Sequence, residues 1–177
     1  MKKLIFSVLA IAALVVTPMS SFAADPTALA TANGSASIIS PINISKTADL
    51  DFGIISGIAA GTVTIAATSG AQLNPVITGD LSVISTSTSK AAAFSVTGSG
   101  NATYAIVMNP SLTLTGTGTA VGKTMTSTLV LDAAKTGAVG TLAGGADNIY
   151  VGGVLTVAAA QTAGPYAGTF NVTINYN

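Results

Sequence analysis

Apolar residues alternate with threonine and serine over short segments along most of the chain. Glycine, asparagine, aspartate or proline interrupts the alternation after each segment. Because successive side chains of a β-strand point to opposite faces, this pattern predicts strands. The expected strands cover residues 37–45, 61–67, 81–85, 92–97, 103–108, 111–115, 124–131, 149–157 and 169–176. Strands this short and this closely spaced favour an all-β, antiparallel sandwich, with a small barrel as second choice.

The first residues follow a different pattern. Met1-Lys2-Lys3 precedes an apolar run over residues 4–16, and small residues stand at Ser21 and Ala23. This order predicts a secretory signal peptide over residues 1–23. The apolar run is too short to span a membrane, although a retained anchor is the alternative. We expect an N-terminal extension over residues 24–35, a β-sandwich domain over 36–177, and no membrane span in the mature chain.

Composition narrows the functional classes. Only 7% of the residues are charged, all of them Lys or Asp, and the chain has no His, Cys or Trp. Without His and Cys, the common metal ligands, the neutral-pH base and the thiolate nucleophile are missing. After loss of the leader, four Lys and six Asp remain, so no basic patch is available for nucleic acid. We therefore expect no enzyme and no catalytic, cofactor or metal site.

Two places concentrate oxygen-bearing side chains. Asp49 and Asp51 lie two positions apart, and Asp147-Asn148 forms a second polar turn. Each place supplies two side chains, whereas calcium needs six or more oxygen ligands. We interpret these carboxylates as solvated, with Asp49 and Asp51 keeping a sheet edge charged.

The C-terminal segment carries the most specific pattern. Phe170, Val172, Ile174 and Tyr176 share one strand face, Tyr176 is penultimate, and Gly164 is fourteenth from the end. The simplest interpretation is that this segment forms the last strand of a sandwich.

The C-terminal segment also resembles the C-terminal motif of chaperone–usher pilus subunits. That resemblance implies an immunoglobulin-like β-sandwich that lacks its final strand. A periplasmic chaperone, and then the N-terminal extension of the next subunit, fills the resulting groove by strand addition. Gly164 would permit close backbone approach, and the four apolar residues would line the groove edge.

A wider resemblance covers most of the chain after residue 47. Its motifs are residues 48–53, 61–65 and 93–98, and the segment from Tyr150 through Gln161 to the C-terminus. In their order and spacing they resemble the bacterial family called domain of unknown function 4402. That family is similar in pattern to spore coat protein U and to archaic-type fimbrial subunits.

The expected donor segment is weak. It offers Ala28, Ala30 and Ala32 on one side and Leu29 on the other, and small side chains bury little area. The next apolar residues, Ile38, Ile42 and Ile44, are interrupted by Pro41, and we assign them to the first domain strand.

Together these observations predict an exported structural subunit of a surface fibre, fimbria or coat that assembles by β-strand addition. Its partners would be like subunits, a periplasmic chaperone and an outer-membrane usher. It would pass through the periplasm to the surface of a Gram-negative bacterium. One alternative is a self-contained adhesin or carbohydrate-binding module, with Tyr166 as the loop aromatic. The other is a small outer-membrane β-barrel, which the 5% aromatic content disfavours.

Overall fold

The computed structural model describes residues 27–56, 59–70, 73–85 and 88–177. The chain divides into two units, residues 1–36 and 37–177. The predicted signal peptide lies outside the described residues. Within the described ranges, no helix is long and apolar enough to cross a membrane.

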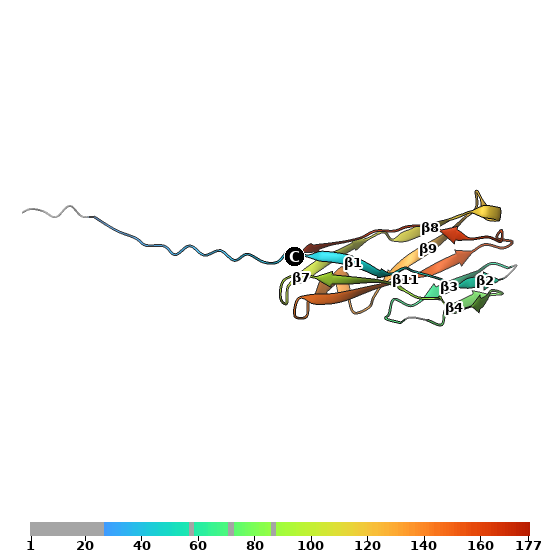
Figure 1. Ribbon diagram of the computed structural model, residues 1–177, viewed down its shortest axis with the longest axis horizontal. Helices are drawn as coiled ribbons and strands as arrows, with labels where there is room; N and C mark the ends of the chain where they lie inside the picture. The colour runs from blue at the N-terminus through green and yellow to red at the C-terminus, as the bar shows by residue number, and fades with distance from the viewer. Residues whose placement is uncertain (1–26, 57–58, 71–72, 86–87) are drawn as a thin grey trace, which may run out of the picture. The chain divides into compact units, whose positions relative to one another are not determined.

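The described part of the first unit, residues 27–36, has no regular secondary structure, and its residues are exposed. The same holds for residues 37–41 at the start of the second unit. Among the described residues no strand precedes β1, which begins at Asn43 (Figure 1). The prediction that the first strand starts at residue 37 and includes Ile38 and Ile42 is therefore wrong. Because Pro41 lacks an N–H group, the residues around it gain little from a strand ladder.

The second unit is all-β, as the alternation predicts. Its described residues form thirteen strands and two single-turn 3₁₀ helices, η1 at Gly118–Ala120 and η2 at Thr136–Ala138. The strands are β1 Asn43–Ala48, β2 Ile54–Ser56, β3 Gly61–Ile65, β4 Val76–Gly79, β5 Ser82–Ser85, β6 Ala92–Thr97, β7 Thr103–Met108, β8 Ser111–Gly116, β9 Thr124–Leu131, β10 Val139–Thr141, β11 Ala146–Val157, β12 Tyr166–Ala167 and β13 Val172–Tyr176.

The largest sheet is antiparallel and curls into a half-barrel. Its main strand order is β1-β6-β11-β9-β8-β12, so β1 and β12 are the edges at the two ends of this path. β11 is long enough to pair with β6 along its first half and with β3 along its second, and β4 extends the sheet beyond β3. Gly152 lies where β11 changes partner, and a Cβ atom there would stand 2.2 Å from the Ile65 carbonyl oxygen. A residue without a side chain is needed at this close approach.

The last two strands, β12 and β13, pair with two strands that follow each other in the chain, β8 and β7. β13 pairs with β7 in a three-stranded sheet of order β10-β7-β13, and β12 pairs with β8 in the large sheet. β7 and β8 are separated only by Asn109-Pro110, so the C-terminal segment runs antiparallel along both strands in turn. A separate pair, β2 with β5, forms a small third sheet.

The buried side chains form two clusters. One surrounds Tyr104, Leu142 and Ile149, and the other surrounds Phe52, Ile65 and Leu155. Leu50 and Leu114 are half-buried and pack against both clusters. The two clusters therefore meet at these leucines, which also line the groove described below.

The nine expected strands are each represented, and the predicted alternation of Phe170, Val172, Ile174 and Tyr176 toward the interior is confirmed. Four short strands were not predicted: β2, β4, β10 and β12. The antiparallel all-β class is confirmed; the largest sheet is a curled half-barrel.

Candidate functional site: an open groove between two sheet edges

A groove of about 820 Å³ lies between the two edges of the curled sheet. One wall is the segment from Lys46 through Ser56, which begins in β1, and the other is residues 161–170, which include β12. We call this feature the open groove. Within the described part of the chain, β1 pairs only with β6 and β12 only with β8. Each edge strand therefore keeps one side of its main chain unpaired, and both edges line the same groove.

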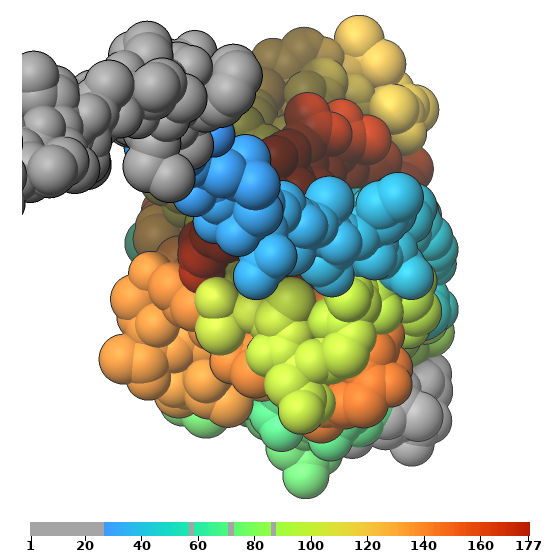
Figure 2. All heavy atoms as spheres, turned by 90° about the vertical axis from the view of Figure 1, so that its left-hand side faces the viewer, coloured from blue at the N-terminus to red at the C-terminus, as the bar shows by residue number. Residues whose placement is uncertain are grey.

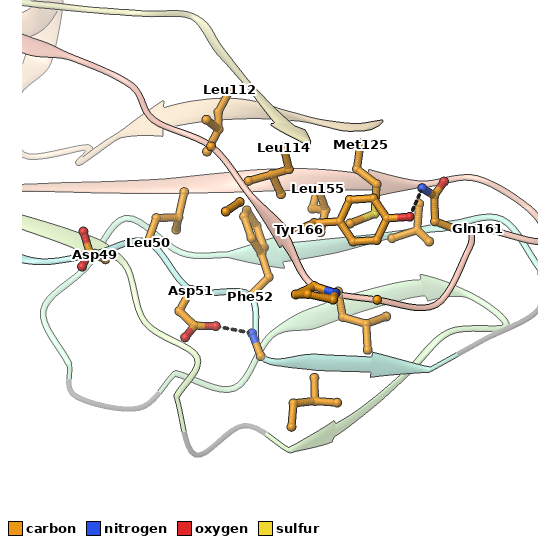
Figure 3. Close-up of a pocket in the computed structure, with 18 of the residues that line it drawn as sticks. Asp49, Leu50, Asp51, Phe52, Leu112, Leu114, Met125, Leu155, Gln161 and Tyr166 are labelled. Atoms are coloured by element: carbon orange, nitrogen blue, oxygen red, sulfur yellow. Dashed lines mark hydrogen bonds between the residues drawn. The ribbon is translucent and has the colours of Figure 1, made fainter. Parts of the chain in front are cut away.

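The floor of the open groove is apolar. Leu112 and Leu114 of β8, Met125 of β9 and Leu155 of β11 contribute to it. Figure 3 shows these side chains on one side, with the Phe52 ring pointing toward them from the opposite side. Since these residues belong to the cores or pack against them, the floor of the open groove is continuous with the interior of the fold.

Charges are confined to the first wall. Lys46 forms an ion pair with Asp49, and the hydrogen bond and charge of Lys46 lower the pKa of the Asp49 carboxyl. The Asp51 carboxylate accepts a hydrogen bond of 2.8 Å from the Gly53 N–H (Figure 3). Leu50 and Phe52 turn inward. The two carboxylates are therefore engaged locally in the wall.

Hydrogen bonds hold the second wall in place. The Pro165 carbonyl accepts from the Thr117 N–H at 2.9 Å, and the Thr119 hydroxyl donates to the Ala163 carbonyl at 2.6 Å. The Tyr166 hydroxyl donates to the Thr162 carbonyl and accepts from Gln161 Nε2 at 2.8 Å. The Gln161–Tyr166 bond lies in the open groove itself (Figure 3), so the bonds that fix this wall include groove-lining side chains.

The predicted groove-edge residues separate into two groups. Gly164 and Phe170 line the open groove. Gly164 has a φ of +154°, and a Cβ atom there would stand 2.8 Å from the Ala120 Cβ, so close approach to η1 requires glycine. The Phe170 ring meets the Phe94 ring edge to face, with 6.3 Å between centroids. Val172, Ile174 and Tyr176 lie beyond the groove, packed against the core around Tyr104.

Tyr176 anchors the C-terminal end of the last strand, beyond the open groove. Its hydroxyl accepts from the Ser99 N–H at 2.7 Å and donates to the Ser40 carbonyl at 2.9 Å. It therefore ties the last strand to the residues that lead into β1. Figure 2 looks at this end, where the turn after β6 and the turn before β11 lie side by side, joined by the Gly98 N–H and the Gly145 carbonyl.

The predicted donor residues lie apart from any strand. Ala28, Leu29, Ala30 and Ala32 belong to the exposed segment before β1, and 90% of Leu29 is accessible. Their side chains are therefore available to a partner.

A buried polar cluster was missed by sequence reasoning. Lys135 Nζ contacts both carboxylate oxygens of Asp147, at 2.6 and 2.7 Å, and the Tyr104 hydroxyl donates to the same carboxylate at 2.8 Å. Burial opposes ionisation of Asp147, but these bonds and that of the Asn148 N–H outweigh it and lower its pKa. Burial, and then the bond to Asp147, raises the pKa of Tyr104. Asp147 is thus a structural ion-pair partner. The expectation of a solvated carboxylate at this position is wrong.

The sequence profile of the family described as Domain of unknown function (DUF4402) matches residues 42–176. The chain belongs to this family. The DUF4402 match contains both walls of the open groove and Tyr176, and it begins one residue before β1. The exposed segment that carries the predicted donor residues lies before it. No curated protein and no solved structure matches the chain.

Proposed function

We propose that this DUF4402 protein is an exported structural subunit of a surface fibre, fimbria or coat, and that a strand from another chain completes its fold. The observation that carries the proposal is the open groove with an unpaired strand edge on each side. An added strand would gain main-chain hydrogen bonds at these edges and would pack over the apolar floor. On this view the fold is an immunoglobulin-like sandwich that lacks one strand.

The occupant we propose is the N-terminal segment of a like subunit. Because β1 begins only at Asn43, the chain before it is longer than the expected extension. Two sets of residues alternate along this segment. The apolar set is Ala28, Ala30, Ala32, Gly34, Ala36 and Ile38, and the other set is Leu29, Thr31, Asn33, Ser35 and Ser37. Such a segment would form a strand with one apolar face and one mostly polar face.

The lengths agree. Eleven residues from Ala28 to Ile38 extend over about 36 Å at roughly 3.3 Å per residue, and the ten residues of the second wall reach at most a similar length. One segment therefore spans the open groove. A periplasmic chaperone would fill the groove first, an outer-membrane usher would then exchange it for the next subunit, and the product would be displayed on a Gram-negative cell surface.

Disulfide trapping tests the proposal, because the chain has no cysteine of its own. One variant carries Ala36→Cys in the donor segment and a second carries Thr169→Cys in the groove wall. Mixing the two under mild oxidation should give a covalent heterodimer, identified by its mass, in excess over the homodimers that form when either variant is oxidised with wild-type protein.

A matched pair of charge variants tests the face of the donor strand. Ala36→Asp places a carboxylate on the apolar face of the donor strand. Ser35→Asp, at the neighbouring residue, places one on its polar face. We expect Ala36→Asp to abolish detergent-resistant multimers and Ser35→Asp to retain them. A chain that stays monomeric with and without a co-expressed chaperone, or equal assembly of the two variants, contradicts the proposal.

A further inference from the structure

We propose that Asn33-Gly34 is a site of spontaneous deamidation in the free subunit, and that strand addition protects it. The chemical site rests on the local structure alone. Its consequence for assembly, and its protection, rest on the proposed function.

The local structure leaves this dipeptide free to react. Residues 27–41 are exposed and lie outside any strand or helix. A Cβ atom on Gly34 would meet nothing within 4 Å. No neighbouring atom therefore crowds Gly34. Because glycine has no side chain, its backbone nitrogen can also approach the Asn33 side chain without hindrance. Glycine also gives the backbone more freedom to adopt the required dihedral angles than any other residue.

The reaction needs only water. The Gly34 nitrogen loses its proton to solvent base and bonds to Asn33 Cγ, the Cγ–Nδ2 bond breaks, and Nδ2 leaves as ammonia. The five-membered succinimide that results then adds water at either of its two carbonyl carbons. Opening at one carbon gives Asp, and opening at the other gives isoaspartate, in which the main chain runs through Cβ. No electrons are transferred.

The other asparagines that are followed by a residue in the sequence are poor substrates for deamidation. Asn43, Asn74, Asn109, Asn148, Asn171 and Asn175 precede Ile, Pro, Pro, Ile, Val and Tyr, all bulkier than glycine or lacking the N–H. Asn101 precedes a small residue, Ala102, but its side-chain oxygen accepts a hydrogen bond of 3.2 Å from the Gly144 N–H. Asn101 is thus the internal control for a small following residue with a restrained side chain.

Modification at Asn33 would damage a donor strand at its centre. Either product adds a carboxylate to a segment whose residues 27–42 carry no charge. Isoaspartate also inserts one atom into the main chain, so Ala28, Ala30 and Ala32 would no longer share a face with Ala36 and Ile38. Register errors of this kind turn the apolar set toward solvent.

Insertion into a groove would prevent the reaction. A strand in a ladder has an extended backbone, and its N–H groups on the paired edge are engaged with the neighbouring strand. The Gly34 nitrogen could then no longer reach Asn33 Cγ. Deamidation would therefore mark subunits that remain unassembled, while assembled subunits would keep an intact Asn33.

The test follows the mature chain through incubation at mildly alkaline pH. Cleavage after Lys46 releases the segment that contains Asn33 and Asn43, and cleavage after Lys90 and Lys123 releases the one that contains Asn101. Mass spectrometry measures the replacement of NH₂ by OH at each asparagine. An isoaspartyl methyltransferase labels the isoaspartate product. The control variants are Asn33→Gln, which cannot close the five-membered ring readily, and Gly34→Val, which hinders the attacking nitrogen.

We expect modification at Asn33 in the monomer, loss of the signal in both variants, and none at Asn43 or Asn101 over the same period. An unmodified Asn33, or equal modification in Gly34→Val, overturns the site. Multimers isolated from the same incubation should keep Asn33 intact; equal modification in multimers and monomers overturns the protection. If no multimers form under any condition, the proposed function fails while the chemical site is still decided by the monomer.

Discussion

The ion pair between Lys135 and Asp147 allows the sharpest test of how this nearly uncharged domain is held together. Their side chains are 10% and 15% exposed, and the Lys135 ammonium contacts both carboxylate oxygens. Lys135 directly precedes η2, whereas Asp147 lies in β11 beside the buried Tyr104 hydroxyl. The pair therefore joins the turn before β10 to the central strand.

The expected magnitude follows from burial. Removing one partner of a buried pair leaves the other charge without compensation, which costs about 3–5 kcal/mol. Asp147→Asn should therefore destabilise the fold by that amount, and Lys135→Met should cost about 3 kcal/mol because Tyr104 still solvates the carboxylate. The double variant leaves no buried charge, so its loss should be smaller than that of either single variant.

Thermal and urea unfolding of the four proteins measures this coupling. For a domain of this size, 1 kcal/mol corresponds to a Tm change of about 2–4 °C, so each single variant should lose roughly 6–20 °C. The exposed pair of Lys46 and Asp49 is the control, since Lys46→Met should leave Tm unchanged. Additive losses in the double variant, or single losses within about 0.5 kcal/mol of zero, would refute the reasoning.

Three further predictions concern stability. Because the pKa of Asp147 is lower in the folded than in the unfolded chain, its contribution to stability is complete above the ordinary carboxyl pKa and declines as pH falls through the folded pKa. Acid titration of Tm should therefore be flatter in Asp147→Asn. Gly140→Ala places a Cβ atom 2.2 Å from the Tyr104 ring and should cost about 1–3 kcal/mol in urea unfolding, whereas Gly34→Ala should cost nothing measurable. Ile174→Ala in the buried C-terminal strand should cost about 2–5 kcal/mol by the same measurement, and a loss below 1 kcal/mol would show that β13 is dispensable.

The sequence predicts a strand well where the two faces of that strand differ in polarity. β13 and β9 are of this kind, and their alternation matches their burial. β2, β10 and β12 have three residues or fewer, too short for a period to be read. They form because a neighbouring strand supplies the partner groups, and that neighbour is distant in sequence.

The open groove could not be predicted from the pattern for a related reason. Its walls are separated by more than a hundred residues, and its existence depends on which strand edges lack partners. Alternation shows which side chains face inward but not which edge is free. The ion pair of Lys135 and Asp147 gave one weak signal: two opposite charges near turns in a chain that has few charges anywhere.

The composition of the donor segment has a consequence for how specific its insertion would be. Alanine methyl groups bury little area, at roughly 0.8 kcal/mol per carbon group, so most of the gain would come from main-chain hydrogen bonds. The same hydrogen bonds can form after the donor strand shifts by two residues along the groove. Ala28, Ala30 and Ala32 could then each occupy the position of another. Ile38 is the exception, because it is the one large side chain of the apolar set and is 99% exposed before insertion. A large residue at one end of a series of small ones would fix the register, since a two-residue slip would move it out of its place in the groove.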